Sequence, residues 1–347
     1  MTRPLSQTTR ARSRFLGAGC VFAVVAVLLA GCYAVPPDRR AQADRLTQQI
    51  RTMPGVVTAS SDVVNSFAQG MVHFWLNVAV TDDITADQLA TITSRYLDDL
   101  RTTDYTGYQT ELDVHRDWNL FAVDSGERAV TNPDQIVEQG RSWVQLRHEF
   151  PGATIRFRAT ITHAGDAVAG RDNGHPHTGT IELPDAADYA AVATTVSRLA
   201  TRFPELSSGS WMISAGKAHP AGITTTRRLP NAGELDVWTK LNADQSIPHV
   251  DAMTINGPTT GPVWISEKTL SRDINVAVQL ARAHLPIVAT LPAPVLYTTN
   301  DHLQGRLDYS GAANGPVAIT VGGCMRRNYR PDAAEQALIN TYETCRR

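Results

Sequence analysis

Three short stretches decide the fold: Met53-Pro54-Gly55-Val56, Phe150-Pro151-Gly152-Ala153 and Ile247-Pro248-His249-Val250. Each lies between a helical pattern and a run of strand-forming residues, and the prolines follow one another at intervals of 97 residues. A proline placed after an apolar residue ends a helix, and Gly55 and Gly152 permit the turn that follows. Equal spacing with matching flanks predicts an internal repeat, with chance similarity as the alternative.

The pattern around each proline predicts the same order of elements: helix, two strands, helix, two strands. In the first unit, residues 38–52 and 85–100 have helical periodicity, and Thr85 with Gln88 predicts a capping box. Strands are expected at 55–64, 72–80, 108–114 and 118–123. The second unit repeats this order over 132–226 and the third over 231–309, before a strand at 317–321 and a helix at 332–345.

This order predicts an α+β protein. Counted from the preceding strand, each unit is a split βαββαβ, or ferredoxin-like, arrangement with helices on one face of an antiparallel sheet. Tandem ferredoxin-like modules are therefore expected over 38–116, 117–217 and 218–347, the third with a strand-helix extension. The alternative is that the strands pair across units into one larger sheet. The half-unit of helix, Pro-Gly-Val and two strands resembles BON-type envelope modules.

Residues 1–31 predict a signal peptide. A basic start precedes an uncharged run from Phe15 to Ala30, which is shorter than the about 20 apolar residues that span a bilayer. The run ends Leu29-Ala30-Gly31-Cys32, which resembles the lipobox of bacterial lipoproteins. The resemblance implies cleavage between Gly31 and Cys32, with a diacylglyceryl group and an N-acyl chain such as palmitate on Cys32. An ordinary cleaved signal peptide and an uncleaved anchor are the alternatives.

The lipid on Cys32 would hold the chain to the extracytoplasmic face of the cell membrane. Its first partners would be the lipoprotein-processing enzymes, and residues 32–37, with Pro36-Pro37, would form a stiff tether. No other cofactor is expected. Only three of the 32 basic residues are lysine, and this arginine-rich usage resembles actinobacterial, mycobacterial-type envelope lipoproteins.

The net charge of the chain limits the classes of partner that it could bind. The chain from Cys32 onward has 28 basic and 34 acidic residues, a net charge of −6, which argues against a nucleic-acid partner.

Cys324 and Cys345 form an even pair in a chain expected in an oxidising compartment, which predicts a disulfide. A thiol site is the alternative.

One loop holds the best polar constellation of the sequence: His163, Asp166, Asp172, His175 and His177. Imidazoles and carboxylates together suit zinc or another transition metal. The alternative is a solvated insertion between two strands, since the loop is rich in turn residues.

Other polar and aromatic residues are interpreted as structural. The acidic pairs Asp82-Asp83, Asp98-Asp99 and Glu111 with Asp113 are expected at helix starts and on polar surfaces. The tryptophans are expected in the core or between units; they are Trp75, Trp118, Trp143, Trp211, Trp238 and Trp264.

These observations favour a non-enzymatic binding or adaptor protein of the cell envelope, and no catalytic residue is assigned. The sequence has no Gly-x-Ser-x-Gly, His-Glu-x-x-His, phosphate-loop or dinucleotide motif, which weakens the common hydrolase and nucleotide-enzyme interpretations. The second hypothesis is a protein or enzyme that handles envelope lipid or glycan, with a cleft between units. The third is metal capture through the loop from His163 to His177.

Overall fold

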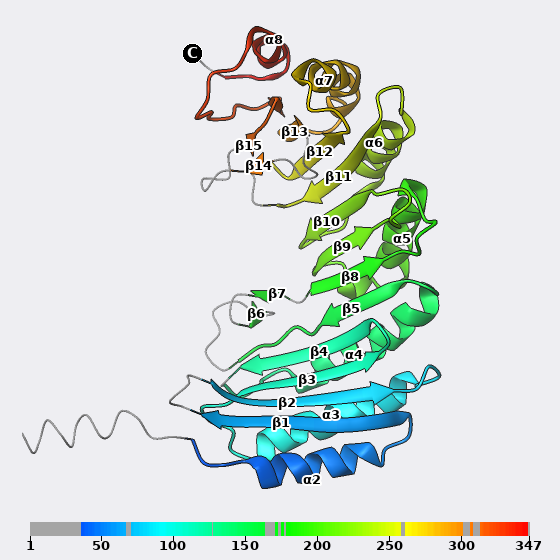
Figure 1. Cartoon of the computed structure of the whole chain (residues 1–347), viewed down its shortest axis with the longest axis vertical. Coiled ribbons are helices and arrows are strands. Elements are labelled where there is room, and N and C mark those ends of the chain that lie inside the picture. The colour runs from blue at the N-terminus through cyan, green and yellow to red at the C-terminus, as the bar shows by residue number, and fades with distance from the viewer. Residues whose placement is uncertain are drawn as a thin grey trace, which may run out of the picture.

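The computed structural model describes residues 36–66, 71–126, 128–163, 171–172, 175–176, 178–257, 261–300, 306–307 and 313–345. These segments contain seven α-helices, and twelve of their strands form one mixed sheet (Figure 1). The predicted signal peptide and the lipobox with Cys32 lie outside the described residues.

The first half of the chain alternates helices with hairpins. Its main elements are α2 (Arg40–Arg51), β1 (Val56–Ser66), β2 (Met71–Val80), α3 (Ala86–Thr102), β3 (Gln109–Arg116), β4 (Asn119–Gly126), α4 (Pro133–Glu149), β5 (Thr154–Arg158) and β8 (Thr178–Glu182). A small hairpin of β6 (Arg171–Asp172) and β7 (His175–Pro176) lies between β5 and β8.

The second half continues in the same way. Its main elements are α5 (Tyr189–Arg202), a 3₁₀ turn (Pro204–Leu206), β9 (Ser210–Ser214), β10 (Gly222–Thr226), α6 (Ala232–Ala243), β11 (His249–Ile255), β12 (Val263–Thr269), α7 (Ile274–Val288), β13 (Val295–Asn300), β16 (Val317–Val321) and α8 (Ala333–Tyr342). A second small hairpin joins β14 (Arg306–Leu307) and β15 (Ala313–Asn314).

The sheet follows the order of the chain from β1 to β16. Strands within each hairpin are antiparallel, and neighbouring hairpins are joined in parallel through a crossover helix. The α+β class is confirmed, but separate ferredoxin-like modules are not. The alternative, in which the strands pair across units, describes what is seen. The repeating element is one helix with one hairpin, because a parallel neighbour needs a crossover while an antiparallel one needs only a turn.

The proline motifs act as the sequence predicts. Helix α2 ends at Arg51 and α4 at Glu149, and both are followed by a glycine with positive φ, +83° at Gly55 and +79° at Gly152. Only glycine adopts this conformation without strain, so the chain can leave the helix and enter the next strand. The predicted capping box at Thr85 is confirmed, because the Thr85 hydroxyl accepts the Gln88 N–H and starts α3 at this point.

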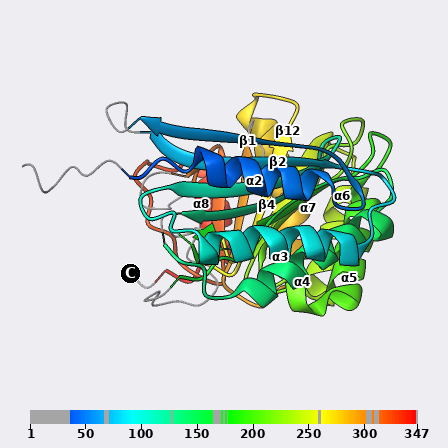
Figure 2. The same cartoon turned by 90° about the horizontal axis from the view of Figure 1, so that it is seen from below.

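The core lies between the sheet and the helices that cover one of its faces. In Figure 2, α3, α4 and α5 lie on the same side of the sheet. Trp143, Trp211 and Trp238 are fully buried in this layer, as predicted. Trp75 and Trp118 are 40% and 77% exposed, so the prediction of a core position for these two is wrong.

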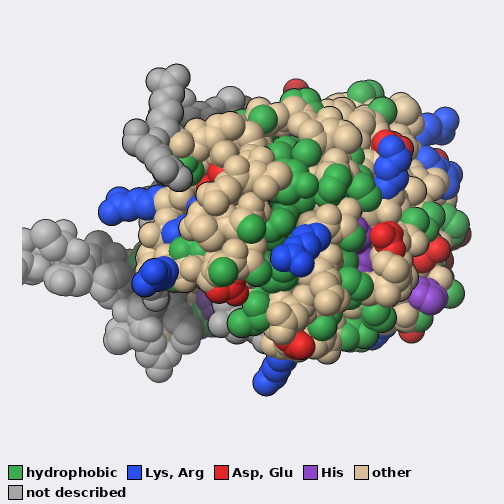
Figure 3. Space-filling view, turned by 90° about the horizontal axis from the view of Figure 1, so that it is seen from above, with side chains coloured by type: hydrophobic (Ala, Val, Ile, Leu, Met, Phe, Trp, Pro, Cys, Tyr) green, Lys and Arg blue, Asp and Glu red, His purple; other side chains and the backbone are tan. Residues whose placement is uncertain are grey.

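The C-terminal edge of the sheet is closed by side chains. Glu335 of α8 accepts the backbone N–H of Ala318 at 3.0 Å, and Glu343 accepts that of Thr320 at 2.9 Å. The predicted disulfide is present and joins Cys324 to Cys345 across this cap, with the two Cα atoms 4.8 Å apart. Figure 3 views this end of the molecule, where hydrophobic side chains lie between scattered charged ones. An edge strand whose backbone groups are occupied is a poor template for further pairing.

The charged residues at the predicted helix starts have other partners. Asp82 lies before α3, but its carboxylate binds Arg116 at 2.6 and 2.9 Å and lies 3.6 Å from Arg147. These arginines lower the pKa of Asp82, with the Arg116 hydrogen bonds as the largest cause.

None of the helices in the described segments is both long enough and apolar enough to cross a membrane.

Candidate functional site

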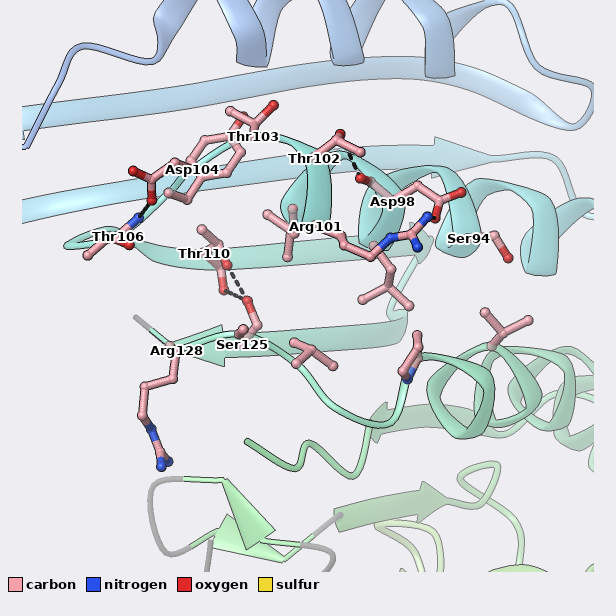
Figure 4. A pocket seen from close by; sticks show the side chains of 18 of the residues that line it. Ser94, Asp98, Arg101, Thr102, Thr103, Asp104, Thr106, Thr110, Ser125 and Arg128 are labelled. Carbon is pink, nitrogen blue, oxygen red and sulfur yellow. Dashed lines mark hydrogen bonds and ion pairs between the residues drawn. The ribbon is translucent and has the colours of Figure 1, made fainter. Parts of the chain in front are cut away.

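A cleft of about 710 Å³ opens between the C-terminal end of α3 and the N-terminal end of α4. Figure 4 shows Ser94, Asp98 and Arg101 along α3 on one side and Ser125 and Arg128 on the other. Its lining includes residues on both sides of the predicted boundary between residues 116 and 117. Its volume is in the range of small-ligand sites, about 300–1,000 Å³.

Packing below the cleft fixes its shape. The loop after α3 turns back so that the Tyr105 ring stacks on Phe74, with centroids 5.2 Å apart, and its hydroxyl donates to Asp99 at 3.2 Å. Burial raises the pKa of Asp99, although the Tyr105 hydrogen bond opposes the shift. Further in, the hydroxyls of Thr110 and Ser125 form a buried hydrogen bond between β3 and β4.

The lining is mixed, and its apolar surface slightly exceeds its polar surface. Asp98 and Arg101 form an ion pair at 3.0 Å on its α3 side, and the apolar part comes from residues such as Leu97 and Val137. The remaining hydroxyl and charged groups are Ser94, Thr102, Thr103, Asp104, Thr106, Arg128 and Asp134. A wall with many hydroxyls beside several charged groups can exchange hydrogen bonds with a ligand that itself carries hydroxyl groups.

A second polar surface lies on the uncovered face of the first strands. The exposed Trp75 ring stacks on His73 with centroids 3.9 Å apart, and His73 contacts Asp62 at 3.2 Å. A small hollow beside Trp75 includes Glu111 and Asp113. This surface therefore combines an exposed aromatic ring with several carboxylates.

The carboxylates on this face are crowded. Arg158 lies 3.0 Å from Asp124 and 3.6 Å from Glu111. Burial and the charge of Asp113 raise the pKa of Glu111, and burial also raises the pKa of Asp113, both against the charge of Arg158. The sequence pairs Glu111 with Asp113, and the β3 register confirms that both lie on one face, opposite Trp75 and Asn77 of β2.

The predicted metal loop is only partly described. His163 is buried, and its Nδ1 lies 3.1 Å from the Ala129 carbonyl oxygen. Asp172 and His175 pair as backbone neighbours in the β6–β7 hairpin. Asp166 and His177, and the side chains of Asp172 and His175, lie outside the described residues. The loop therefore stays a prediction.

A buried polar cluster between the sheet and α7 was missed by the sequence analysis. It contains His249 and Asp251 of β11, Glu267 of β12, His284 of α7 and Tyr297 of β13, all buried. The signal was present in the sequence as charged residues inside apolar strand patterns. The cluster could not be recognised from this signal, because its residues come from four elements and are up to 48 positions apart in the sequence.

The cluster is held by short contacts. Glu267 Oε1 lies 2.6 Å from His284 Nδ1, and the Tyr297 hydroxyl donates to the other oxygen of Glu267. His249 Nδ1 lies 2.6 Å from the Ile247 carbonyl oxygen, and its Nε2 lies 3.4 Å from Asp251 Oδ2. One ligand atom from each of His249, Glu267 and His284 lies within 4.8 Å of the others.

Burial and charge act against each other in this cluster. Burial alone would lower the pKa of His249, but Asp251, with the Ile247 carbonyl and the charge of Glu267, raises this pKa to about 9. Burial also raises the pKa of Glu267, although its contact with His284 opposes the shift. Groups with perturbed pKa values mark functional sites, and also structural ion-pair networks.

Comparison with known proteins adds no family. The chain matches no protein-family profile, no curated protein and no solved structure at a significant level.

Proposed function

We propose that the chain is a non-enzymatic binding protein of the cell envelope, anchored through lipid on Cys32, and that the cleft between α3 and α4 takes up a segment of glycan. The observation that carries this proposal is the cleft itself. It has the volume of a ligand site, and hydroxyl, carboxylate and guanidinium groups line it. A neutral sugar chain presents hydroxyl groups that both donate and accept hydrogen bonds, and these match such a wall.

The lining favours glycan over lipid. A lipid chain needs a deep apolar pocket, because burying unpaired polar groups against hydrocarbon is unfavourable. In this cleft the Asp98–Arg101 ion pair and the side chains of Ser94 and Thr102 lie where acyl chains would have to pack. Of the two ligand classes in the second sequence hypothesis, glycan therefore fits better.

The test is calorimetric titration of the purified full-length chain with neutral tetrasaccharides built from glucose, galactose or mannose. The Asp98→Ala/Arg101→Ala variant should weaken binding of the active sugar by about tenfold or more, since about two hydrogen bonds are lost. The matched control is Asp236→Ala/Lys240→Ala, which removes a 2.7 Å ion pair on α6 outside the cleft and should leave affinity unchanged.

A larger side chain in the cleft gives a second test. Ser94→Trp should reduce binding by filling the space while leaving the fold intact, because this residue is half-buried on the surface of α3. Failure of all the sugars to bind at millimolar concentration would refute the glycan proposal. Equal loss in the control variant would place the binding site elsewhere.

A second candidate function is an adaptor that binds a basic segment of an envelope protein. The observation that favours it is the face around Trp75, where Asp62, Glu111 and Asp113 surround an exposed aromatic ring. Carboxylates attract lysine and arginine, and the indole face adds a cation–π contact.

This alternative is tested by photo-crosslinking in the native membrane. A crosslinking residue replaces Trp75 in one variant and Trp118, which is exposed on the β3–β4 turn, in the other. A single protein linked at stoichiometric yield only from position 75, and lost when Asp62 and Glu111 are changed to Asn and Gln, would support the adaptor. Equal labelling from both positions would contradict it.

A further inference from the structure

Four side-chain atoms of the buried cluster make no hydrogen bond, although each is shielded from solvent. They are both carboxylate oxygens of Asp251, Nε2 of His249 and Nε2 of His284. Buried polar atoms are almost always paired, because an unpaired one loses its hydration without compensation. Three of them have only ion-pair contacts, at 3.4 Å between His249 Nε2 and Asp251 Oδ2 and at 3.5 Å between His284 Nε2 and Asp244, so the cluster is short of hydrogen bonds.

The fold brings the acceptors together. His249 and Asp251 are two residues apart on β11, so their side chains point to the same face, which α7 covers. Asp251 pairs directly with Glu267 in the β11–β12 register. Two carboxylates that are cross-strand neighbours repel each other, and more strongly when both are buried.

The ring of His249 is oriented so that its Nε2 faces the cluster. Its Nδ1 contacts the Ile247 carbonyl oxygen, which can only accept, so Nδ1 carries the proton. When the ring loses the proton on Nε2, this atom offers a lone pair to a metal, 3.4 Å from Asp251 Oδ2. A backbone carbonyl on one ring nitrogen is the arrangement that prepares the other nitrogen for a metal.

We propose that this cluster binds a divalent transition-metal cation of the zinc class, with His249, Glu267 and His284 as ligands and Asp251 as the fourth. Ligand atoms that share a tetrahedral zinc at about 2.0–2.1 Å lie about 3.3 Å from one another, close to the 3.4 Å between His249 and Asp251. The set of two imidazoles and two carboxylates suits zinc better than calcium or magnesium, which prefer oxygen ligands alone.

The charges also match. Histidines that bind a metal are neutral, so Asp251 and Glu267 would then place two negative charges in the core, and a divalent cation neutralises both. The Tyr297 hydroxyl would remain as the supporting donor to Glu267. On binding, His284 Nδ1 and Glu267 Oε1 would exchange their mutual contact for contacts with the cation, while His284 Nε2 would stay beside Asp244.

Asp244, the residue that follows α6, connects the cluster to the protein surface. The side chain of Asp244 is 39% exposed, and its carboxylate lies 3.5 Å from Nε2 of the fully buried His284. A cation can be drawn first to Asp244 and then passed to the cluster. The full burial of the other ligands points to a structural metal with no open position for substrate.

The experiment uses full-length protein stripped with a chelator and titrated with cobalt(II), which absorbs strongly when it is tetrahedral, and then with zinc. One equivalent of cobalt should bind, zinc should displace it, and the thermal midpoint should rise with zinc concentration. Failure to bind either metal up to millimolar concentration would overturn the proposal. The cluster would then be stabilised only by hydrogen bonds and ion pairs among its own residues.

Variants locate the site. Tyr297→Phe removes only a supporting donor and should weaken cobalt binding by about 10–100-fold, and Glu267→Gln or His284→Gln should weaken it more. The matched control is His177→Gln, in the loop with its own predicted metal set. A cobalt spectrum unchanged in Tyr297→Phe and Glu267→Gln but lost in His177→Gln would assign the metal to the loop instead. If a ligand variant fails to fold, Tyr297→Phe and the unmodified chain still decide between these outcomes.

Discussion

Reduction of the Cys324–Cys345 disulfide should loosen the C-terminal cap before it unfolds the protein. The bond closes a loop with a sequence separation of 21, and chain entropy for a loop of that length amounts to about 3.3 kcal/mol. The loop contains α8, whose Glu335 holds the Ala318 N–H, and Glu343, which holds the Thr320 N–H. These two amides therefore report directly on the cap.

If the whole effect falls on opening of the cap, the hydrogen exchange of these two amides should speed up by roughly 200-fold, since 1.4 kcal/mol is a factor of ten. The assay compares oxidised protein, protein reduced with dithiothreitol and a Cys324→Ser/Cys345→Ser variant. Amides of β3, at the other end of the sheet, serve as the internal control. Exchange of Ala318 and Thr320 that changes by less than about tenfold, or as much as in β3, would refute the reasoning.

Three further predictions concern the fold. Thr85→Ala removes the capping box of α3 and should cost about 1 kcal/mol in urea unfolding. Gly179→Ala would place a Cβ 2.2 Å from the Trp211 ring and should cost about 1–3 kcal/mol in the same assay, unless the indole moves. Asp113 has a folded pKa above its ordinary 3.8, so its ionisation removes stability as the pH rises from that value through the folded pKa. Asp113→Asn should therefore raise the thermal midpoint at pH 7, and the gain should vanish below about pH 4, where both proteins are neutral at this position.

The elements could be predicted because their signals are local. The helix stop at Pro54-Gly55, the cap at Thr85 and the alternation along β2 each depend on a few neighbouring residues, and all three are present in the structure. The sequence also predicted the alternation of helices and hairpins in the correct order. The sequence did not determine which strands pair with one another, because a split βαββαβ unit and a continuous sheet use the same order of helices and strands.

Which neighbour a strand pairs with depends on the crossover connections. A helix such as α3 carries the chain from β2 to β3, placing β3 parallel to β2 and beyond it. The next hairpin then starts at the free edge, so the sheet grows in chain order until α8 closes it. Local periodicity contains no information on this choice. The exposure of Trp75 has the same cause, since none of the described segments forms a second layer over that face of the strand.

The buried cluster marks the place where the repeat is broken. The first two proline motifs have glycine in the third position, Gly55 and Gly152, and the third motif has His249. The glycines have positive φ and start a strand one or more residues later, whereas β11 starts at His249 itself and so directs its side chain toward α7. The replacement buries an imidazole beside Asp251 and Glu267, and the proposed cation would join these three groups.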